Sequence, residues 1–298
     1  MRTGYRRAHA RRGALRRASG IAAVRAAIAR WKARGERVEF VPTMGAIHAG
    51  HLSLVRRARR SRTRVVASIF VNPLQFGPHE DFGRYPRPLR RDRALLAGAG
   101  VDLLWEPSAA ELYPPGHSTR VHVGRLGNVL EGASRPGHFD GVATVVAKLL
   151  NVVRPDVLWL GQKDAQQAMI LERMCRDLDL PVRVRRGPTV READGLACSS
   201  RNAYLGRDER AQAAALARGL AAARRALRAG ECSAARIRRA VLQVWRAYPL
   251  VREDYVVVAD ARTLEVLRAV TPGRRVLVAV AARVGRARLI DNFEWKAP

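Results

Sequence analysis

The sequence predicts an α/β protein in which a doubly wound parallel sheet is followed by a smaller α+β domain. Apolar runs at residues 38–41, 65–71, 101–105 and 157–161 alternate with stretches of helical periodicity. The run at 65–71 is apolar at nearly every position, as in a strand that is covered on both faces. Beyond residue 208, alanine- and arginine-rich helical stretches precede further strand patterns, which indicates a second unit.

The first half of the chain alternates helical and extended patterns. The first expected helix carries Ile21, Val24, Ile28 and Trp31 on one apolar stripe. Strand, helix, strand is the repeating unit of a parallel sheet with helices on both faces. In chain order we expect helices at 21–33, 51–58, 142–153 and 166–178, a helix ending at 95–100, and strands at 38–41, 65–71, 101–105, 121–123, 157–161 and 181–184.

The character of the chain changes near Gly187–Pro188, where we place a domain boundary. Residues 19–187 are expected to form the sheet domain, and residues 188–298 a smaller domain that acts as a lid. Residues 1–18 are expected to be a basic, disordered leader, because the first acidic residue of the chain is Glu36. The lid is expected to contain helices at 208–229 and 233–248 and strands at 255–258, 276–280 and 288–290.

The composition limits the classes of function. The 298 residues carry a formal charge of +29, nearly all of it as arginine spread along the chain. Aromatic residues make up 6% and are not interleaved with the basic ones, so we expect salt-sensitive adhesion to polyanions but no specific nucleic-acid partner. No apolar run approaches a membrane span, so no membrane partner is expected. Three scattered cysteines lack metal-binding spacing and favour a reduced, cytoplasmic protein.

Residues 40–55 organise the rest of the chain. The apolar run stops at Pro42, passes through a turn that contains Gly45, and enters an amphipathic helix. Backbone N–H groups at a helix N-terminus are unpaired and favour anionic oxygens. His48 and His51 are three residues apart, so both can reach one phosphate group at the carboxyl end of a strand.

The string Met-Gly-Ala-Ile-His-Ala-Gly-His at residues 44–51 resembles the His-x-Gly-His signature of adenylate-forming nucleotidylyltransferases. The longer string at 42–55 is similar to that of one family of this superfamily, the pantoate–β-alanine ligases. Ala49 departs from the family, which more often has an acidic residue there. The resemblance implies a Rossmann-like fold and ATP contacts from four residues of the string, namely Met44, Gly45, His48 and His51.

The loop at 72–87 follows the second strand at the same edge of the sheet. Its Asn72 and Gln75 carry donors and acceptors suited to a hydroxy acid. The string Phe-Val-Asn-Pro-Leu-Gln-Phe-Gly-Pro, followed by Tyr-Pro-Arg, strengthens the resemblance, which implies that Gln75 contacts pantoate and β-alanine. Asp92 is expected on the helix that follows, where a carboxylate can help to hold Mg²⁺, although the family's acidic pair is reduced here because Arg91 precedes it.

Residues 161–167, Gly-Gln-Lys-Asp-Ala-Gln-Gln, follow a buried strand and begin a helix. An ammonium at such a helix start can reach phosphate oxygens, which favours a site at Lys163. The string resembles a family motif, although Ala165 stands where an aromatic residue is usual. The resemblance implies ATP contacts from Gly161, Gln162, Lys163 and Asp164, and a pantoate contact from Gln167.

Residues 190–205 contain Ser-Ser-Arg-Asn before a new helix. An isolated segment of this kind is most often a helix cap, yet two hydroxyls and a guanidinium can also clamp a triphosphate. The string Asp-Gly-Leu-Ala-Cys-Ser-Ser-Arg-Asn-Ala-Tyr-Leu resembles the second ATP signature of the family. The resemblance implies ATP contacts from Val190, Cys198, Ser199, Ser200 and Arg201, with Cys198 as a wall residue.

The resemblance implies a homodimeric, ATP-dependent ligase of coenzyme A biosynthesis that joins pantoate to β-alanine through a pantoyl adenylate, with Mg²⁺ beside ATP. His48, His51 and Lys163 are the expected catalytic residues. His138 is equally a substrate-loop residue or scaffolding. Two alternatives stay open, another adenylyl transferase of the superfamily and an arginine-rich nucleic-acid-binding protein.

Overall fold

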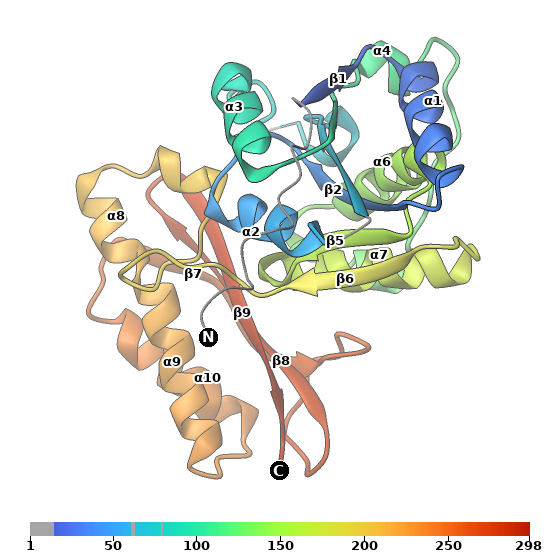
Figure 1. Cartoon of the computed structure of the whole chain (residues 1–298). Helices are drawn as coiled ribbons and strands as arrows, with labels where there is room; N and C mark the ends of the chain where they lie inside the picture. Colours follow the sequence, from blue (N-terminus) through green and yellow to red (C-terminus); the bar gives the residue numbers. More distant parts are fainter. Residues whose placement is uncertain (1–14, 61–62, 79) are drawn as a thin grey trace, which may run out of the picture.

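The computed structural model describes residues 15–60, 63–78 and 80–298, so residues 1–14 of the expected leader lie outside the described residues. Two sheets dominate the fold (Figure 1). The predicted doubly wound sheet with a smaller α+β unit is confirmed. The larger sheet is parallel, with the spatial order β1 (Arg16–Ala18), β4 (Leu103–Trp105), β3 (Thr63–Ile69), β2 (Arg37–Thr43), β5 (Val157–Gly161) and β6 (Arg183–Gly187).

Helices connect these strands along the chain and cover both faces of the sheet. The order of strands reverses between β2 and β5, because the chain proceeds from β2 to one edge and returns to β5 for the other. Ligands bind at such a switch point in open α/β sheets. The connecting helices are α1 (Ile21–Lys32), α2 (Ala49–Ala58), α3 (Leu89–Ala99), α4 (Ala109–Leu112), α5 (Glu131–Ser134), α6 (His138–Val153) and α7 (Ala165–Asp177), with 3₁₀ turns η1 (Pro73–Gln75), η2 (Gly124–Gly127) and η3 (Gln162–Asp164).

Alternation along the central strands sends apolar side chains to two separate cores. Successive residues of a strand face opposite sides of the sheet. Phe40 and Leu158 belong to the core shared with α1, α6 and α7, whereas Val41 and Trp159 belong to the core shared with α2 and α3. The sheet is therefore buried on both faces, as its apolar strands predict.

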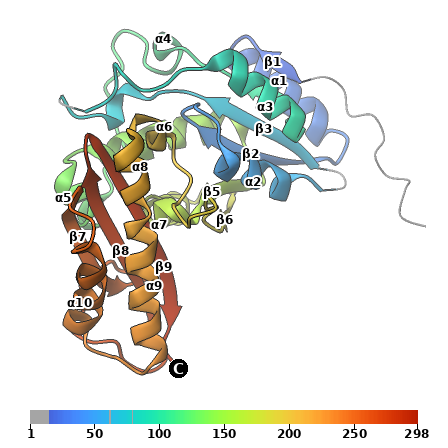
Figure 2. The same ribbon diagram turned by 90° about the vertical axis from the view of Figure 1, so that its left-hand side faces the viewer.

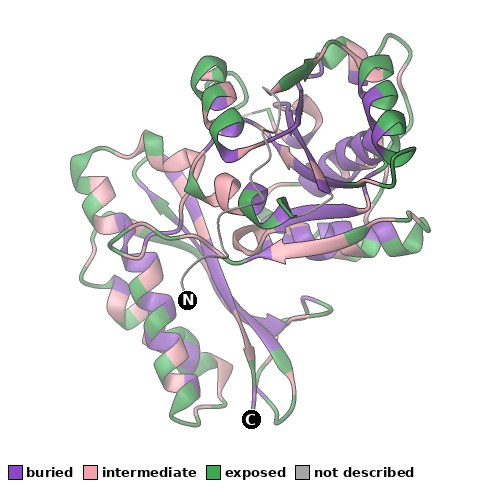
Figure 3. Ribbon diagram, in the orientation of Figure 1, coloured by how far each residue is buried: buried purple, intermediate pink, exposed green. Residues whose placement is uncertain are grey.

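The C-terminal unit packs one face of a three-stranded antiparallel sheet against two helices and the other against α7. On the α7 side, Leu277 and Ala279 contact Ala165 and Met169. Figure 2 shows this unit projecting from the parallel sheet, and Figure 3 shows β8 buried over most of its length. Its elements are η4 (Ser200–Tyr204), α8 (Arg207–Ala213), α9 (Ala215–Arg228), α10 (Ala234–Trp245), β7 (Val251–Asp260), β8 (Arg275–Val284) and β9 (Ala287–Lys296). Within the described part of the chain, none of the helices is both long and apolar enough to span a membrane.

Disorder was the wrong expectation for Arg16–Ala18, which form β1 at the edge of the sheet and pair with Leu103–Trp105. The Arg16 N–H donates to the Asp102 carbonyl at 3.2 Å, and the Arg17 guanidinium lies 3.0 Å from Glu106. These long-range partners hold a segment whose composition alone indicates a solvated leader.

Residues 121–123 are not the expected short strand, because side chains take up their backbone donors. The Val121 N–H donates to the Thr144 hydroxyl at 2.9 Å, and the Val123 N–H donates to Asp140 at 3.0 Å. The helix expected at 208–229 is also divided, since α8 and α9 are separate elements.

Helix α6 packs its Gly141 directly against η1. A methyl group at Gly141 would lie 2.1 Å from the Leu74 carbonyl oxygen and 2.8 Å from the Gln75 Cα. The Asn72 amide also donates to the Gly141 carbonyl at 3.0 Å. The missing side chain thus allows the helix to hold the segment that carries Gln75.

Replacing Gly141 by alanine is expected to lower the free energy of unfolding by about 1–3 kcal/mol, because backbone atoms must move to admit the methyl group. Gly98 provides a matched control, since it is exposed within α3 and has nothing within 4 Å of an added methyl. Gly98→Ala is expected to be neutral or to stabilise by up to about 1 kcal/mol. Denaturant unfolding of the two variants measures the contrast, and equal stabilities would contradict the packing argument.

Candidate active site

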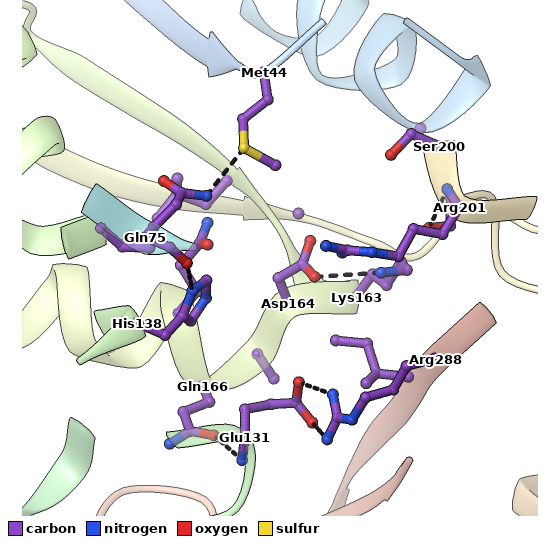
Figure 4. Close-up of a pocket in the computed structure, with 18 of the residues that line it drawn as sticks. Met44, Gln75, Glu131, His138, Lys163, Asp164, Gln166, Ser200, Arg201 and Arg288 are labelled. Atoms are coloured by element: carbon purple, nitrogen blue, oxygen red, sulfur yellow. Dashed lines mark hydrogen bonds and ion pairs between the residues drawn. The ribbon is translucent and has the colours of Figure 1, made fainter. Parts of the chain in front are cut away.

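A cavity of about 790 Å³ opens where the strand order reverses, at the carboxyl ends of β2 and β5. Its size suits small-molecule ligands, and both units contribute to its wall (Figure 4). Gly45, Gln162 and Asp92 are not part of the lining. The predicted site residues that line it are Met44, His48, His51, Asn72, Gln75, Gly161, Lys163, Asp164, Gln167, Val190, Cys198, Ser199, Ser200 and Arg201.

The turn after β2 has an unusual backbone that Asp92 holds in place. Gly45 and Ala46 have φ values of 88° and 49°, a left-handed conformation that costs free energy for alanine. The fully buried Asp92 carboxylate accepts the N–H groups of Ala46 and Ile47, each at 2.8 Å. Asp92 therefore shapes the turn that leads into α2, and the metal role expected for it does not fit this geometry.

His48 and His51 present one defined ring nitrogen each to the cavity. His48 caps α2, and its Nδ1 accepts the Gly50 N–H at 3.1 Å. The His51 Nδ1 accepts the His48 N–H at 3.4 Å. Because each Nδ1 accepts, each neutral ring carries its proton on Nε2. Two Nε2–H donors, on rings whose centroids lie 4.0 Å apart, are left for a ligand.

Both histidines are uncharged at neutral pH. Burial lowers the pKa of His48 to about 4, and the Lys163 ammonium adds to the effect. Burial lowers the pKa of His51 to about 3, and the neighbouring His48 adds to the effect. They therefore contribute oriented N–H donors, while the positive charge must come from elsewhere.

Lys163 supplies positive charge at the same end of the cavity. Its ammonium lies 3.3 Å from the Asp164 carboxylate. Burial alone would raise the pKa of Asp164, but the Lys163 ammonium and the Arg201 guanidinium together hold that pKa below its ordinary value. Gln162 faces the C-terminal unit instead, since its amide donates to Asn292 at 3.3 Å and to Glu294 at 3.2 Å.

Gln75 lines another part of the cavity, and both polar atoms of its side-chain amide are hydrogen-bonded. Its Nε2–H donates to the Met44 sulfur at 3.0 Å, and its Oε1 accepts from the Asn72 amide at 3.1 Å. The Tyr113 hydroxyl donates to Asn72 at 2.7 Å in turn. Such a chain of hydrogen bonds fixes the orientation of Gln75 before any ligand arrives.

His138 lines the cavity and also holds the backbone of Gln75. The Arg135 guanidinium lies 3.0 Å from the His138 Nε2. Since arginine only donates, Nε2 accepts, and the Nδ1–H donates to the Gln75 carbonyl at 2.7 Å. Burial lowers the pKa of His138 to about 4, with Arg135 adding to the effect. His138 therefore lines the cavity and also acts as scaffolding for Gln75.

The two glutamines of α7 have different surroundings. The Gln166 amide donates to the carbonyls of Leu126 and Val129, and its oxygen accepts the Glu131 N–H at 3.0 Å. Gln166 is therefore structural. Gln167 lines the cavity, where a ligand can reach it.

Ser200 and Arg201 are held by two residues to which the sequence patterns assigned no role. Arg201 donates two hydrogen bonds to Asp81, at 3.0 and 3.1 Å, and the Ser200 hydroxyl lies 3.0 Å from that of Tyr85. Asp81 and Tyr85 belong to the loop that also carries Gln75. Tyr85 itself begins the Tyr-Pro-Arg string at 85–87, which pointed to this part of the loop without indicating these contacts.

Val190 and Cys198 form part of the wall beside this segment. The Cys198 N–H donates to the Val190 carbonyl at 2.9 Å. Burial raises the pKa of the Cys198 thiol, so it is protonated at neutral pH. A protonated thiol is a poor nucleophile, which agrees with the expected wall role.

A second cluster that the sequence did not predict closes the cavity from the C-terminal unit. Arg288 of β9 donates to Glu131 of α5 at 2.5 and 2.9 Å, across 157 residues of chain. The Tyr255 hydroxyl donates to the same carboxylate at 2.7 Å. No local pattern in the sequence links these residues.

The described residues do not fit a magnesium ion held by the protein. The described part of the chain has no group of three or more His, Cys, Asp or Glu side chains placed to hold a metal ion. Both Asp92 oxygens accept backbone N–H groups. The acidic side chains lining the cavity are paired with basic ones, namely Glu80 with Arg135, Asp81 with Arg201, Glu131 and Asp254 with Arg288, Asp164 with Lys163, and Asp291 with Arg191.

Comparison with known proteins gives consistent matches over nearly the whole chain. A family profile described as pantoate-beta-alanine ligase matches residues 16–294. The pantothenate synthetase of Moorella thermoacetica is 54% identical over 272 residues, which are 91% of this chain and 95% of the relative. The crystal structure of pantothenate synthetase from Thermus thermophilus is 52% identical and superposes with a TM-score of 0.87, covering 93% of this chain and 98% of that one. Pantoate-beta-alanine ligase from Francisella tularensis, complexed with beta-gamma ATP and beta-alanine, is 31% identical with a TM-score of 0.74, covering 94% and 97%.

The lowered pKa values of His48, His51 and His138 predict a pH-dependent stability. As pH falls below the ordinary value of 6.5, the unfolded chain binds protons that the folded chain does not bind until about pH 4 at His48 and His138 and about pH 3 at His51. Native stability is therefore expected to fall across this pH range, by up to about 1.4 kcal/mol per pH unit for each histidine. NMR titration of the three imidazoles in the folded protein checks the premise, and midpoints near 6.5 would refute it.

Asp92→Asn is expected to lower the free energy of unfolding by about 1–3 kcal/mol, because the buried turn loses a carboxylate acceptor. The loss should be the same with and without added MgCl₂. Asp177→Asn is the control, since the Asp177 side chain is 54% exposed, and it should change stability by less than about 0.5 kcal/mol. A stability loss that appears only when Mg²⁺ is present would restore the metal role.

Proposed function

Because the chain belongs to the pantoate–β-alanine ligase family, we propose which residues of the cavity carry out the reaction of that family. The chain is a pantoate–β-alanine ligase, an enzyme that condenses pantoate with β-alanine using ATP. One observation carries the assignment of the site. His48, His51 and Lys163 meet the fixed amide of Gln75 in a single cavity at the switch point of the sheet.

The first step joins pantoate to the nucleotide. A carboxylate oxygen of pantoate attacks the α-phosphorus of ATP, the bond to the bridging oxygen of the β-phosphate breaks, and pyrophosphate leaves. The Nε2–H groups of His48 and His51 donate to the charge that develops on the α-phosphate oxygens, and the Lys163 ammonium neutralises it. No protein nucleophile takes part, so orientation and charge stabilisation supply the rate acceleration.

The second step uses the mixed anhydride formed in the first. The β-alanine amine attacks the acyl carbon of pantoyl adenylate, the bond from that carbon to the phosphate oxygen breaks, and AMP leaves with the proton that the nitrogen gives up. Water would compete for the same carbon, so the cavity must exclude it. Gln75, Asn72 and Gln167 orient the two substrates, and Met44 shares this end of the site.

The proposed contacts to ATP come from the residues near Lys163. Ser199, Ser200 and Arg201 clamp the triphosphate together with Lys163. Magnesium is proposed only as the counter-ion that accompanies ATP, with no protein ligand assigned to it. The remaining contacts to ATP are proposed for Met44, Gly45, Gly161, Gln162, Asp164, Val190 and Cys198, of which Gly45 and Gln162 are not part of the cavity lining.

The C-terminal unit, residues 188–298, is proposed as a lid over the site formed by residues 19–187. Separate sheets and largely separate apolar cores support a boundary near Gly187–Pro188. A homodimer is proposed on the family resemblance, and light scattering on the purified protein tests it. A cytoplasmic location is proposed because Cys175, Cys198 and Cys232 are all free thiols.

Pyrophosphate release from ATP is expected to require pantoate when β-alanine is withheld, with AMP and pantothenate appearing once β-alanine is added. His51→Ala and Lys163→Ala should each slow the first step by about 10²-fold or more. Lys32→Ala, an exposed lysine at the end of α1, should leave it unchanged. Retention of full activity by His51→Ala and Lys163→Ala would remove these residues from the mechanism. Pyrophosphate release that does not depend on pantoate would favour the adenylyl-transferase alternative, because such an enzyme needs no pantoate pocket around Gln75.

A further inference from the structure

Strand β9 brings the C-terminal unit into contact with both nucleotide-binding segments. Asp291 and Asn292 lie side by side in this strand, and their side chains face opposite sides of the sheet. They are 2% and 6% exposed, which is rare for these residue types unless their polar groups are paired. Both line the cavity, yet neither belongs to a motif that the sequence singles out.

The Asn292 side-chain amide makes three hydrogen bonds to the segment that carries Lys163. Its Nδ2 donates to the Lys163 carbonyl at 2.7 Å and to the Gln162 carbonyl at 3.1 Å. Its Oδ1 accepts from the Gln162 side chain at 3.3 Å. Two successive carbonyls on one amide fix the backbone at Lys163, and therefore the direction in which its side chain leaves the chain.

Asp291 makes an equivalent connection on the other side of the sheet. Its carboxylate accepts two hydrogen bonds from the Arg191 guanidinium, at 2.6 and 3.0 Å. Arg191 also donates to the Gly195 carbonyl at 2.9 Å and pairs through its backbone with Ala197. The turn at 191–197 is thereby closed, and it delivers Cys198 and Ser199 to the cavity.

We propose that Asp291 and Asn292 are positioning residues for the ATP-dependent step. One rigid dipeptide holds Lys163 on one side and the segment leading to Ser199–Arg201 on the other, so it sets the spacing between the two halves of the triphosphate clamp. Positioning groups act through such fixed geometry without contacting the substrate. The proposal rests on the assignment of Lys163 and Ser199–Arg201 to ATP.

The test compares ATP binding and kinetics in Asn292→Ala, Lys163→Ala and the double variant. Asn292→Ala is expected to raise the KM for ATP and the Kd of ATP about tenfold, and to leave the KM for pantoate within about twofold. In the Lys163→Ala background, Asn292→Ala should weaken ATP binding by less than about twofold, because the group that it positions is gone. Asp291→Asn provides a second variant with the same expected selectivity for ATP, should Asn292→Ala fold poorly. Asn151→Ala, an exposed amide on α6, is the control and should change neither constant.

The outcomes separate the two levels of assignment. If Lys163→Ala leaves ATP binding unchanged, the assignment of Lys163 fails and the positioning proposal fails with it. If Lys163→Ala weakens ATP binding but Asn292→Ala and Asp291→Asn do not, only the positioning proposal is overturned. Equal losses for ATP and pantoate, or the same tenfold loss from Asn292→Ala with and without Lys163, would show a merely structural role and also overturn it.

Discussion

The buried carboxylate of Asp92 is the constraint on which the geometry of the site depends. Gly45 and Ala46 adopt a left-handed backbone conformation, which costs free energy at Ala46 unless other contacts stabilise it. Two hydrogen bonds from Ala46 and Ile47 to the Asp92 carboxylate offset that cost, and Asp92 lies on α3, which begins just after the loop at 72–87. The same turn sets the start of α2, and with it the positions of His48 and His51. A substitution at Asp92 is therefore expected to change the reaction rate by moving His48 and His51, without any contact between Asp92 and a substrate.

The charges of the cavity are organised as pairs rather than as a free basic surface. Arg201 uses its Nε and one terminal nitrogen on Asp81, so its other terminal nitrogen keeps two N–H groups for a phosphate. Asp81 thus orients the guanidinium without using all of its donors. The neutral histidines fit the same scheme, because two imidazolium rings 4.0 Å apart beside Lys163 would repel one another. Specific charge placement, and not the net charge of +29, favours a polyphosphate here.

Residues close together in the chain could be predicted, and residues joined across it could not. The strings around His48, Gln75, Lys163 and Ser199 lie at strand ends or helix starts, so local pattern places them at one edge of the sheet. The partners that hold them are distant, since Asp92 is 46 residues from Ala46 and Asp81 is 120 from Arg201. Composition also misled at Arg16–Ala18, where pairing with β4 outweighs a solvated, basic character. These contacts depend on long-range packing, which local sequence patterns do not reveal.

The division of the triphosphate clamp between two units ties nucleotide binding to their relative position. His48, His51 and Lys163 belong to the parallel-sheet unit, whereas Ser199, Ser200 and Arg201 follow the proposed boundary at Gly187–Pro188. Any separation of the units would break the contacts of β9 with residues 162–163 and of Arg201 with Asp81. If the C-terminal unit acts as the proposed lid, only its closed position offers all of the proposed donors to one ATP. ATP therefore has its highest affinity for that arrangement and must stabilise it, because a ligand shifts a conformational equilibrium by its difference in affinity for the two states. On this proposal, closure is coupled to the arrival of the nucleotide, and the anhydride forms in a site from which water is already excluded.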